Sequence, residues 1–287
     1  MAANYMHVDV FSTRPYSGNS LAVFPNSPGL TADQMLRITQ ELRHFETVFF
    51  EPTGKASAVR ARVFDLFEEL PFAGHPLIGG AAVLHQQAGH AGPQTWTIEL
   101  ASKIVTVDTD RSEGGYYGLL DQGTPEVLAP MDRHDAFPEA FGLSHSDLHP
   151  ELPPQVVSTG LRYLIVPVVS GVLGRARIRR DITPLLSGIG AQFAVLFDEA
   201  ALEIRHWNND GIVEDVATGS AAGTIGAYRL RHGLARGGET FILHQGQYVG
   251  RPSALRIQPE GTAESIRTVK VGGDVALVGR GTLDVLP

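Results

Sequence analysis

The sequence predicts an α+β protein made of two similar halves, each a mainly antiparallel sheet around one apolar helix. Short segments of alternating polar and apolar residues, typical of strands, fill most of the chain and are separated by turn residues. Two loop-into-helix segments interrupt them, and their glycines Gly74 and Gly219 lie about half a chain length apart. Both segments continue as helices that are apolar nearly all round, which predicts that each helix lies inside a shell of strands.

The first half is expected to hold two helices among its strands. Thr31 and Gln34 have capping-box spacing at the start of a helix over 30–45. A second helix is expected from Pro76, a residue favoured at the first helical position, to a stop at Gly89. Strands are expected over 6–11, 20–24, 46–52 and 59–67, and as a pair over 95–110.

The second half repeats this order in outline. An irregular, proline-rich stretch from Gly118 to about Pro154 is expected to hold the crossing between the halves. The predicted lobes are therefore 1–119 with 276–287, and 120–275. A helical patch is expected at 184–189, and the second apolar helix is expected to end at Gly233. Strands are expected over 155–169, 191–199, 201–210, 240–246, 253–259 and 267–286.

Composition excludes several classes of function. The net charge of −8 argues against a nucleic-acid partner, and no apolar run approaches the roughly 18 residues of a membrane span. The chain has no cysteine, which excludes thiol nucleophiles and thiolate zinc sites. Its N-terminus lacks a signal-peptide pattern, so we expect a cytoplasmic protein without a membrane partner.

No cofactor or metal is expected. The glycine-rich segment GGDVALVGRGT is not followed by a helix, so it does not predict a nucleotide site. Histidines and aspartates between Asp132 and His149, including His134 and Asp135, have residue types that bind metals. A solvated connecting segment is the preferred interpretation of that cluster.

Four polar residues near the ends of predicted helices are candidates for chemistry, and each also has an ordinary structural explanation. His75 has the residue type of an acid or base, yet it equally fits a buried helix cap. Ser220 is typical of a cap and Asp215 of an N-terminal acid that the helix dipole favours. Glu46, at the expected change from helix to strand, resembles a solvated glutamate. Taken singly, none of the four establishes a site.

Their joint pattern says more. The turns at Gly74 and Gly219 each lead into a helix of small residues, where free backbone N–H groups bind carboxylates and stabilise a developing enolate. If both turns face one cleft, a single mobile carboxylate there would transfer a proton on a carboxylated substrate without a cofactor.

The sequence resembles the PhzF family of phenazine-biosynthesis proteins, which shares the diaminopimelate epimerase fold. The resemblance runs the length of the chain and rests on the segments VDVFSTRPYSGNSLAVF, ETVFF, ELPFAGHP, STGLRYLIVPV, EDVATGSAAG and HQGQYVGRPS. It implies two pseudo-symmetric, barrel-like lobes with the active site between them, and a homodimer. It also implies a catalytic Glu46, with His75, Asp215 and Ser220 around a small carboxylated substrate and Asn19 lining the site.

The reaction that the resemblance implies is isomerisation of trans-2,3-dihydro-3-hydroxyanthranilate. Glu46 would act alternately as base and acid, so a pKa raised by burial would help it. Asp215 and His75 would hold the amine and hydroxyl groups, and Ser220 with the helix-start N–H groups would hold the carboxylate.

Two other functions stay open. One is an epimerase or lyase that acts on an amino-acid derivative, with Glu46 opposed by Asp215 or His75. The other is a non-catalytic binding protein of the same fold. The chain departs from the usual family pattern at RHFET, GNS and EDVATG, which puts the identity of the substrate in question.

Overall fold

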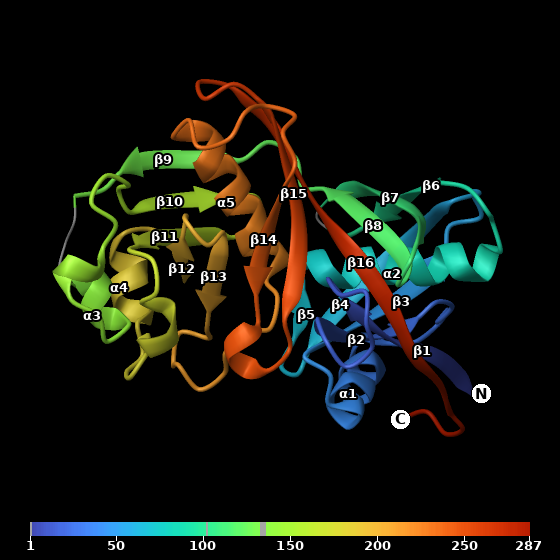
Figure 1. The fold of residues 1–287 in the computed structure, drawn as a ribbon. Helices are drawn as coiled ribbons and strands as arrows, with labels where there is room; N and C mark the ends of the chain where they lie inside the picture. The colour runs from blue at the N-terminus through green and yellow to red at the C-terminus, as the bar shows by residue number, and fades with distance from the viewer. Residues whose placement is uncertain (1, 102, 133–135) are drawn as a thin grey trace. The chain divides into compact units, whose positions relative to one another are not determined.

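The computed structural model describes residues 2–101, 103–132 and 136–287, so His134 and Asp135 of the discounted metal cluster lie outside the described residues. The chain divides into two compact units (Figure 1). Unit 1 comprises Met1–Asp121 and Gly272–Pro287, and unit 2 comprises Gln122–Val271. The predicted α+β class is confirmed, because strands predominate and helices are few.

The strands of unit 1 form a closed circuit of pairings. Their order is β1-β2-β3-β4-β6-β7-β8-β16, β5 adds to β4, and β16 also pairs with β1. Most of these strand pairs are antiparallel, whereas β2–β3 and β4–β6 are parallel. The bounds are β1 (Ala3–Val10), β2 (Asn19–Phe24), β3 (Glu46–Pro52), β4 (Ala58–Asp65), β5 (Glu69–Leu70), β6 (Gln94–Glu99), β7 (Ile104–Ser112), β8 (Gly115–Asp121) and β16 (Ile266–Leu283).

Each parallel pair in unit 1 is joined through a helix, since parallel strands need a crossover connection. Helix α1 (Ala32–Leu42) connects β2 to β3, and α2 (Gly74–Ala88) lies between β4 and β6. Thr31 and Gln34 form the expected capping box. The helix ends earlier than predicted because Arg43 adopts the left-handed conformation, with φ of 58°. Helix α1 covers a cluster formed by Phe24, Phe49 and Phe64.

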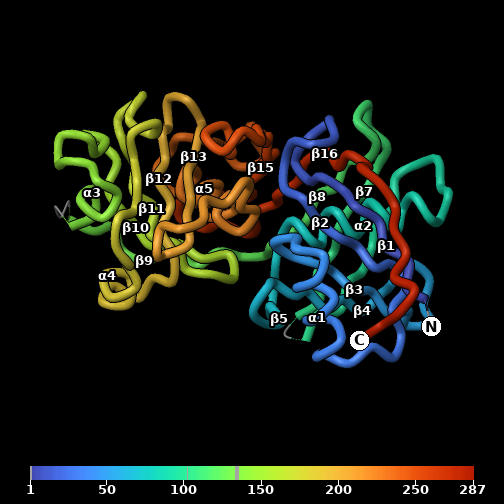
Figure 2. Tube along the Cα trace, turned by 90° about the horizontal axis from the view of Figure 1, so that it is seen from below, coloured from blue at the N-terminus to red at the C-terminus, as the bar shows by residue number. Residues whose placement is uncertain are grey.

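Helix α2 lies inside unit 1, as its apolar sequence predicts. Every residue from its start to His85 is buried, and it contacts β1, β2, β3, β6, β7 and β8 (Figure 2). Small residues permit this close packing: a Cβ added at Gly79 would lie 2.7 Å from the Leu21 side chain, and one at Gly80 would lie 2.5 Å from the Phe50 ring. The helix ends at the predicted Gly89, whose φ is 70°. Pro76 was predicted to be the first residue of the helix, but the helix begins at Gly74 and Pro76 is its third residue.

The strands of unit 2 have a similar order of pairings, β9-β10-β11-β12-β13-β14-β15-β16. Parallel pairs again occur where a helix intervenes, at β11–β12 and β13–β14. The Gln122 N–H donates to Val269 O and the Val269 N–H donates to Gly123 O, which ties the segment before β9 to β16. The bounds are β9 (Glu126–Pro130), β10 (Gln155–Ser158), β11 (Arg162–Val168), β12 (Phe193–Asp198), β13 (Glu203–His206), β14 (Phe241–Gln245) and β15 (Ser253–Gly261).

The central helix of unit 2 is α5 (Gly219–Arg231), which contacts β10, β11 and β15. Gly233 follows its end with φ of 70°, at the predicted stop. A separate hydrophobic cluster that includes Phe141, Leu164 and Trp207 lies under the short helices α3 (Ala136–Ala140) and α4 (Thr183–Gly188). The helical patch expected at 184–189 is therefore confirmed as α4.

The region from Gly118 to Pro154 is more regular than predicted. It contains the end of β8, all of β9 and the helix α3. The signal for β8 was present in GYYGLLD, whose residues alternate between buried and half-buried along the strand. The prolines that predict irregular structure in this region all follow the strand.

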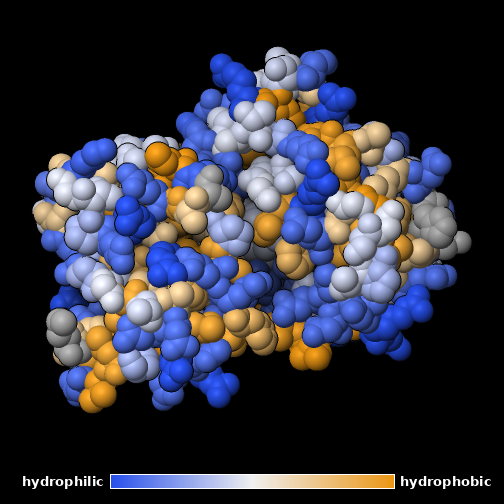
Figure 3. Space-filling view, turned by 180° about the vertical axis from the view of Figure 1, so that it is seen from behind, coloured by the Kyte–Doolittle hydropathy of each residue, from blue (hydrophilic) through white to orange (hydrophobic). Residues whose placement is uncertain are grey.

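No helix among the described residues is long and apolar enough to cross a membrane. Hydrophilic residues spread over much of the face in Figure 3, with hydrophobic ones scattered among them.

Candidate active site

All the residues proposed from the sequence except Asp215, which lies in the turn before α5, are at the starts of strands and helices. In unit 1, Asn19 opens β2, Glu46 opens β3 and Gly74 opens α2. In unit 2, Gly219 opens α5 and Ser220 follows it. His75 and Ser220 therefore have the same position, the second residue, in the two central helices.

Glu46 and His75 contact each other. Glu46 Oε2 lies 3.3 Å from His75 Nδ1, and the two side chains are 21% and 8% exposed. The carboxylate is therefore sheltered but still reachable, whereas the imidazole is almost enclosed. A carboxylate beside an imidazole is a common arrangement for proton transfer, because each group affects the protonation of the other.

Strand register brings Asn19 to the same side of the sheet as Glu46. Glu46 pairs with Leu21 on β2, and Asn19, two residues before Leu21, shares its face. The Leu21 side chain packs against Gly79, so this face is the one that α2 covers. Gly18 makes the turn that precedes Asn19. Its φ is 71°, and a Cβ there would lie 2.3 Å from Val10 O.

In unit 2 a dense set of hydrogen bonds holds Asp215. Its backbone N–H donates to His206 O at 3.0 Å, and its carboxylate accepts from the Thr218 hydroxyl at 2.6 Å. Gln245 links both ends of this turn: its amide N–H donates to Asp215 O at 2.9 Å, and its amide oxygen accepts from the Thr218 N–H at 2.8 Å. The carboxylate therefore has a fixed position before any ligand binds.

The neighbouring Glu214 is fixed by a buried arginine. Arg205 donates through Nε and Nη2 to the two oxygens of Glu214, at 2.8 and 2.5 Å. Its guanidinium lies over the rings of Trp207 and Tyr248, 4.4 Å from each ring centre. This double hydrogen bond adds a second constraint on the chain that leads to Asp215.

Ser220 contacts a tyrosine that the sequence did not single out. The Tyr163 hydroxyl lies 2.8 Å from Ser220 Oγ. The Tyr163 ring packs against the rings of His206 and Phe193, with centres 5.4 and 5.5 Å away. Burial lowers the pKa of His206, although the Asp215 charge partly opposes this shift. His206 is therefore neutral near pH 7.

Neither central helix uses its N-cap side chain to bind the first turn. Ala73 has no capping group, and Thr218 directs its hydroxyl to Asp215 instead. Helix N-termini of this kind present backbone N–H groups to anions. The geometry thus places a carboxylate–imidazole pair in unit 1, and in unit 2 a helix start without a side-chain cap close to the fixed Asp215 carboxylate.

Sequence reasoning missed Tyr163, Thr218 and Gln245. Tyr163 lies inside an apolar strand, where a tyrosine is ordinarily a core residue. Gln245 lies about thirty residues from the turn that it holds, and no local pattern connects the two. Thr218 was visible in ATGS but reads as an N-cap.

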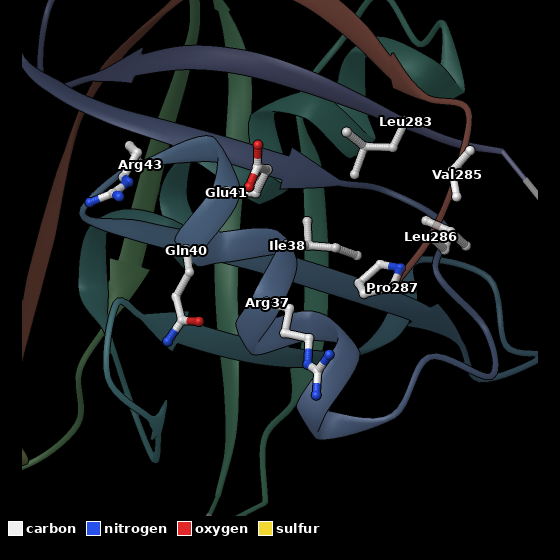
Figure 4. A pocket seen from close by; sticks show the side chains of 9 residues that line it. All are labelled: Arg37, Ile38, Gln40, Glu41, Arg43, Leu283, Val285, Leu286 and Pro287. Carbon is white, nitrogen blue, oxygen red and sulfur yellow. The ribbon is translucent and has the colours of Figure 1, made fainter.

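A pocket of about 550 Å³ lies elsewhere in unit 1, between α1 and the end of the chain (Figure 4). Arg37, Arg43, Leu283 and Pro287 are among its lining residues, and none of the proposed site residues lines it. Within the described part of the chain, no group of three or more histidine, aspartate and glutamate side chains is arranged to hold a metal.

The chain is similar to known proteins over nearly its whole length. The family model for phenazine biosynthesis-like proteins (PhzC-PhzF) matches residues 8–281. The solved structure of a predicted epimerase from Pseudomonas aeruginosa is 47% identical, with a TM-score of 0.92 and 99% of each chain covered. An uncharacterized isomerase of Pasteurella multocida is 33% identical over 98% of this chain and 94% of its own. The trans-2,3-dihydro-3-hydroxyanthranilate isomerase of Pseudomonas chlororaphis is 30% identical over 98% and 99%.

Proposed function

Because the chain belongs to the phenazine biosynthesis-like PhzC-PhzF family, we propose that it isomerises a small carboxylated cyclic substrate similar to trans-2,3-dihydro-3-hydroxyanthranilate. The chain is an isomerase: its full-length relatives carry that name, and one of them is named for this substrate. The identity of about 30% to that relative supports the substrate class. The departures from the usual family pattern at RHFET and EDVATG are compatible with a substrate that has a different ring.

The observation that carries the proposed mechanism is the contact between Glu46 and His75. In this mechanism Glu46 takes a proton from the hydroxyl-bearing carbon of the ring and returns it to another ring carbon. The product is an enol that relaxes to the ketone. The partly exposed carboxylate of Glu46 is reachable by a substrate, and the enclosed His75 beside it helps to hold that carboxylate in place. No step requires a cofactor or a thiol, and the chain has no cysteine.

Unit 2 is proposed to supply the groups that hold the substrate. Asp215 would bind the amine, and Ser220 with the backbone N–H groups that follow Gly219 would bind the carboxylate. In unit 1, Asn19 and the backbone at Gly74 would complete the site. The fixed position of Asp215 supports this division, because a preorganised acceptor loses little on binding.

We propose further that units 1 and 2 are pseudo-symmetric, barrel-like lobes that bind one substrate between them. Their similar order of strand pairings, and the matching places of α2 and α5, support the symmetry. The predicted lobe boundaries near 119 and 275, the homodimer and the cytoplasmic location stay predictions.

An epimerase is the second candidate. The 47% identical structure from P. aeruginosa is described as a predicted epimerase, which favours this alternative. A two-base epimerase exchanges the substrate hydrogen with solvent at the stereocentre, whereas a single carboxylate retains part of the label within the molecule. Turnover of a candidate substrate in deuterium oxide, followed by mass spectrometry, separates the two mechanisms.

The decisive test is Glu46→Gln, assayed with trans-2,3-dihydro-3-hydroxyanthranilate by the change in ultraviolet absorbance. Loss of the acid–base group should lower kcat by about 10²–10⁴-fold while the substrate still binds. A variant with nearly normal kcat would remove Glu46 from the mechanism. A wild-type protein that binds the substrate without turnover would support the non-catalytic alternative instead.

A further inference from the structure

Tyr163 is the most informative polar group that the proposed mechanism leaves unused. It lies in β11 and is only 2% exposed, so it is too enclosed to be a primary contact for a substrate. Its hydroxyl nevertheless lies 2.8 Å from the oxygen of Ser220, which is half-buried at the start of α5.

The direction of this hydrogen bond decides what Ser220 can bind. A hydroxyl group has one hydrogen to donate, and an ionised carboxylate can only accept. If Ser220 donates to Tyr163, it offers only lone pairs to a ligand. If Tyr163 donates to Ser220, the serine hydrogen is free to point at a ligand oxygen.

We propose that Tyr163 is a specificity-determining positioning residue, which donates to Ser220 and thereby makes that serine a hydrogen-bond donor selective for a carboxylate. A phenol is more acidic than an alcohol and is the stronger donor of the two. The helix start favours the same polarity, because the backbone N–H groups near Ser220 attract a negative group. This inference rests on the proposed carboxylate-binding role of Ser220.

Packing holds the phenol in place for this role. His206 and Phe193 lie against the Tyr163 ring, and Nδ1 of His206 is itself fixed by a 2.9 Å hydrogen bond to Ala194 O. A carbonyl only accepts, so that nitrogen of His206 carries the hydrogen. The ring of Tyr163 is therefore held between fixed neighbours, and little rotational freedom remains to be lost when a ligand binds.

The backbone around Ser220 is held as well. The Gln122 amide N–H donates to Gly219 O at 2.9 Å, and the Thr159 hydroxyl donates to the Gln122 amide oxygen at 2.7 Å. A Cβ at Gly223 would lie 1.9 Å from that amide oxygen, so only glycine permits the Gln122 side chain to reach the start of the helix. With the backbone fixed, the orientation of the Ser220 hydroxyl depends on Tyr163.

The test compares a carboxylate with its neutral amide in direct binding, using 2-aminobenzoate and 2-aminobenzamide as probes in calorimetry. The proteins are the wild type, Tyr163→Phe, Ser220→Ala and the double variant. We expect Tyr163→Phe to weaken 2-aminobenzoate binding about 5–10-fold and to change 2-aminobenzamide binding less than twofold. In the Ser220→Ala background, Tyr163→Phe should have no further effect.

Tyr228→Phe is the matched control. Its hydroxyl also makes one hydrogen bond in unit 2, to Pro153 O at 2.8 Å, and it lies about 12 Å along α5 from Ser220. This variant should bind both probes as the wild type does.

Three results would overturn the proposal. They are equal weakening of both probes by Tyr163→Phe, additive effects in the double variant, and a wild type without preference for the carboxylate. Because binding alone is measured, the expected pattern would stand even if no isomerisation were found. Loss of the proposed reaction and loss of this inference are thus separate outcomes.

Discussion

The first turns of α2 and α5 occupy matching places in the two units, but they are built differently. At α2, His75 contacts the carboxylate of Glu46, and the N-cap is an alanine without a capping group. At α5, Ser220 contacts Tyr163, and a network that includes Gln245 fixes the turn before it.

This difference agrees with the proposed division of roles, in which unit 1 transfers the proton and unit 2 holds the substrate. Proton transfer needs a group whose protonation can change, and the Glu46 carboxylate beside the His75 imidazole is such a group. Recognition needs groups whose positions do not change, which the hydrogen bonds around Asp215 provide. The proposed function thus assigns two different roles to one strand–helix arrangement, according to the side chains that surround its helix start.

The strongest test of this division replaces the second residue of each central helix, which removes the imidazole in one case and the hydroxyl group in the other. His75→Asn should lower kcat by about 10²-fold with little change in KM, because the imidazole no longer supports Glu46. Ser220→Ala should mainly raise KM, by about 10-fold, because a hydrogen bond to a charged ligand is lost. Steady-state kinetics on the same substrate separates the two effects.

Thermal unfolding of both variants is the accompanying control, since His75 is buried and its replacement can affect folding. Comparable unfolding midpoints would assign the kinetic changes to the site. If His75→Asn raised KM and left kcat unchanged, the proposed division between the two helix starts would be wrong.

A smaller effect is expected from overpacking the central helices. Gly80→Ala places a Cβ 2.5 Å from the Phe50 ring, and Gly226→Ala places one 2.7 Å from the Ile257 side chain. Each should lower the free energy of unfolding by about 1–3 kcal/mol, with the larger loss at Gly80, where strands surround the helix. Urea denaturation measures the difference.

Gly92→Ala and Gly188→Ala are the matched controls, one in each unit, because a Cβ at either position meets nothing within 4 Å. They should be nearly neutral or slightly stabilising. A loss at Gly226 equal to that at Gly80 would show that α5 is as tightly enclosed as α2.

The smallest effect concerns pH and distinguishes unit 2. Burial lowers the pKa of His206 in the folded state below the ordinary 6.5. As the pH falls below about 6.5, this histidine takes up a proton in the unfolded chain before it does so in the folded protein. The free energy of unfolding is therefore highest above that pH and decreases below it. His206→Asn should make the thermal unfolding midpoint depend less steeply on pH between about pH 5 and pH 7. Thermal unfolding scans across this pH range measure the difference from the wild type.

Burial also lowers the pKa of His232. His232 contributes to the pH dependence of stability equally in the wild type and in His206→Asn, so comparing the two proteins isolates the effect of His206. An unchanged slope in His206→Asn would mean that protonation of this histidine is not linked to folding.

The sequence by itself determined much of the local structure. The capping box at Thr31, the stops at Gly89 and Gly233, and the strands around them were predicted and are confirmed. Hydrophobic periodicity and turn residues act over a few positions, so a linear pattern contains them. The burial of α2 was also predictable, because a helix that is apolar on every side has no face for solvent.

Only the tertiary structure decided which polar groups meet. The contact of Glu46 with His75 joins a strand to a helix 29 positions later, and Tyr163 reaches Ser220 across 57 positions. Sequence patterns identify residue types at such places, but the distances between them depend on strand register and helix packing. The packing of strands against helices therefore determines whether a tyrosine only packs in the core or also forms a hydrogen bond with a serine.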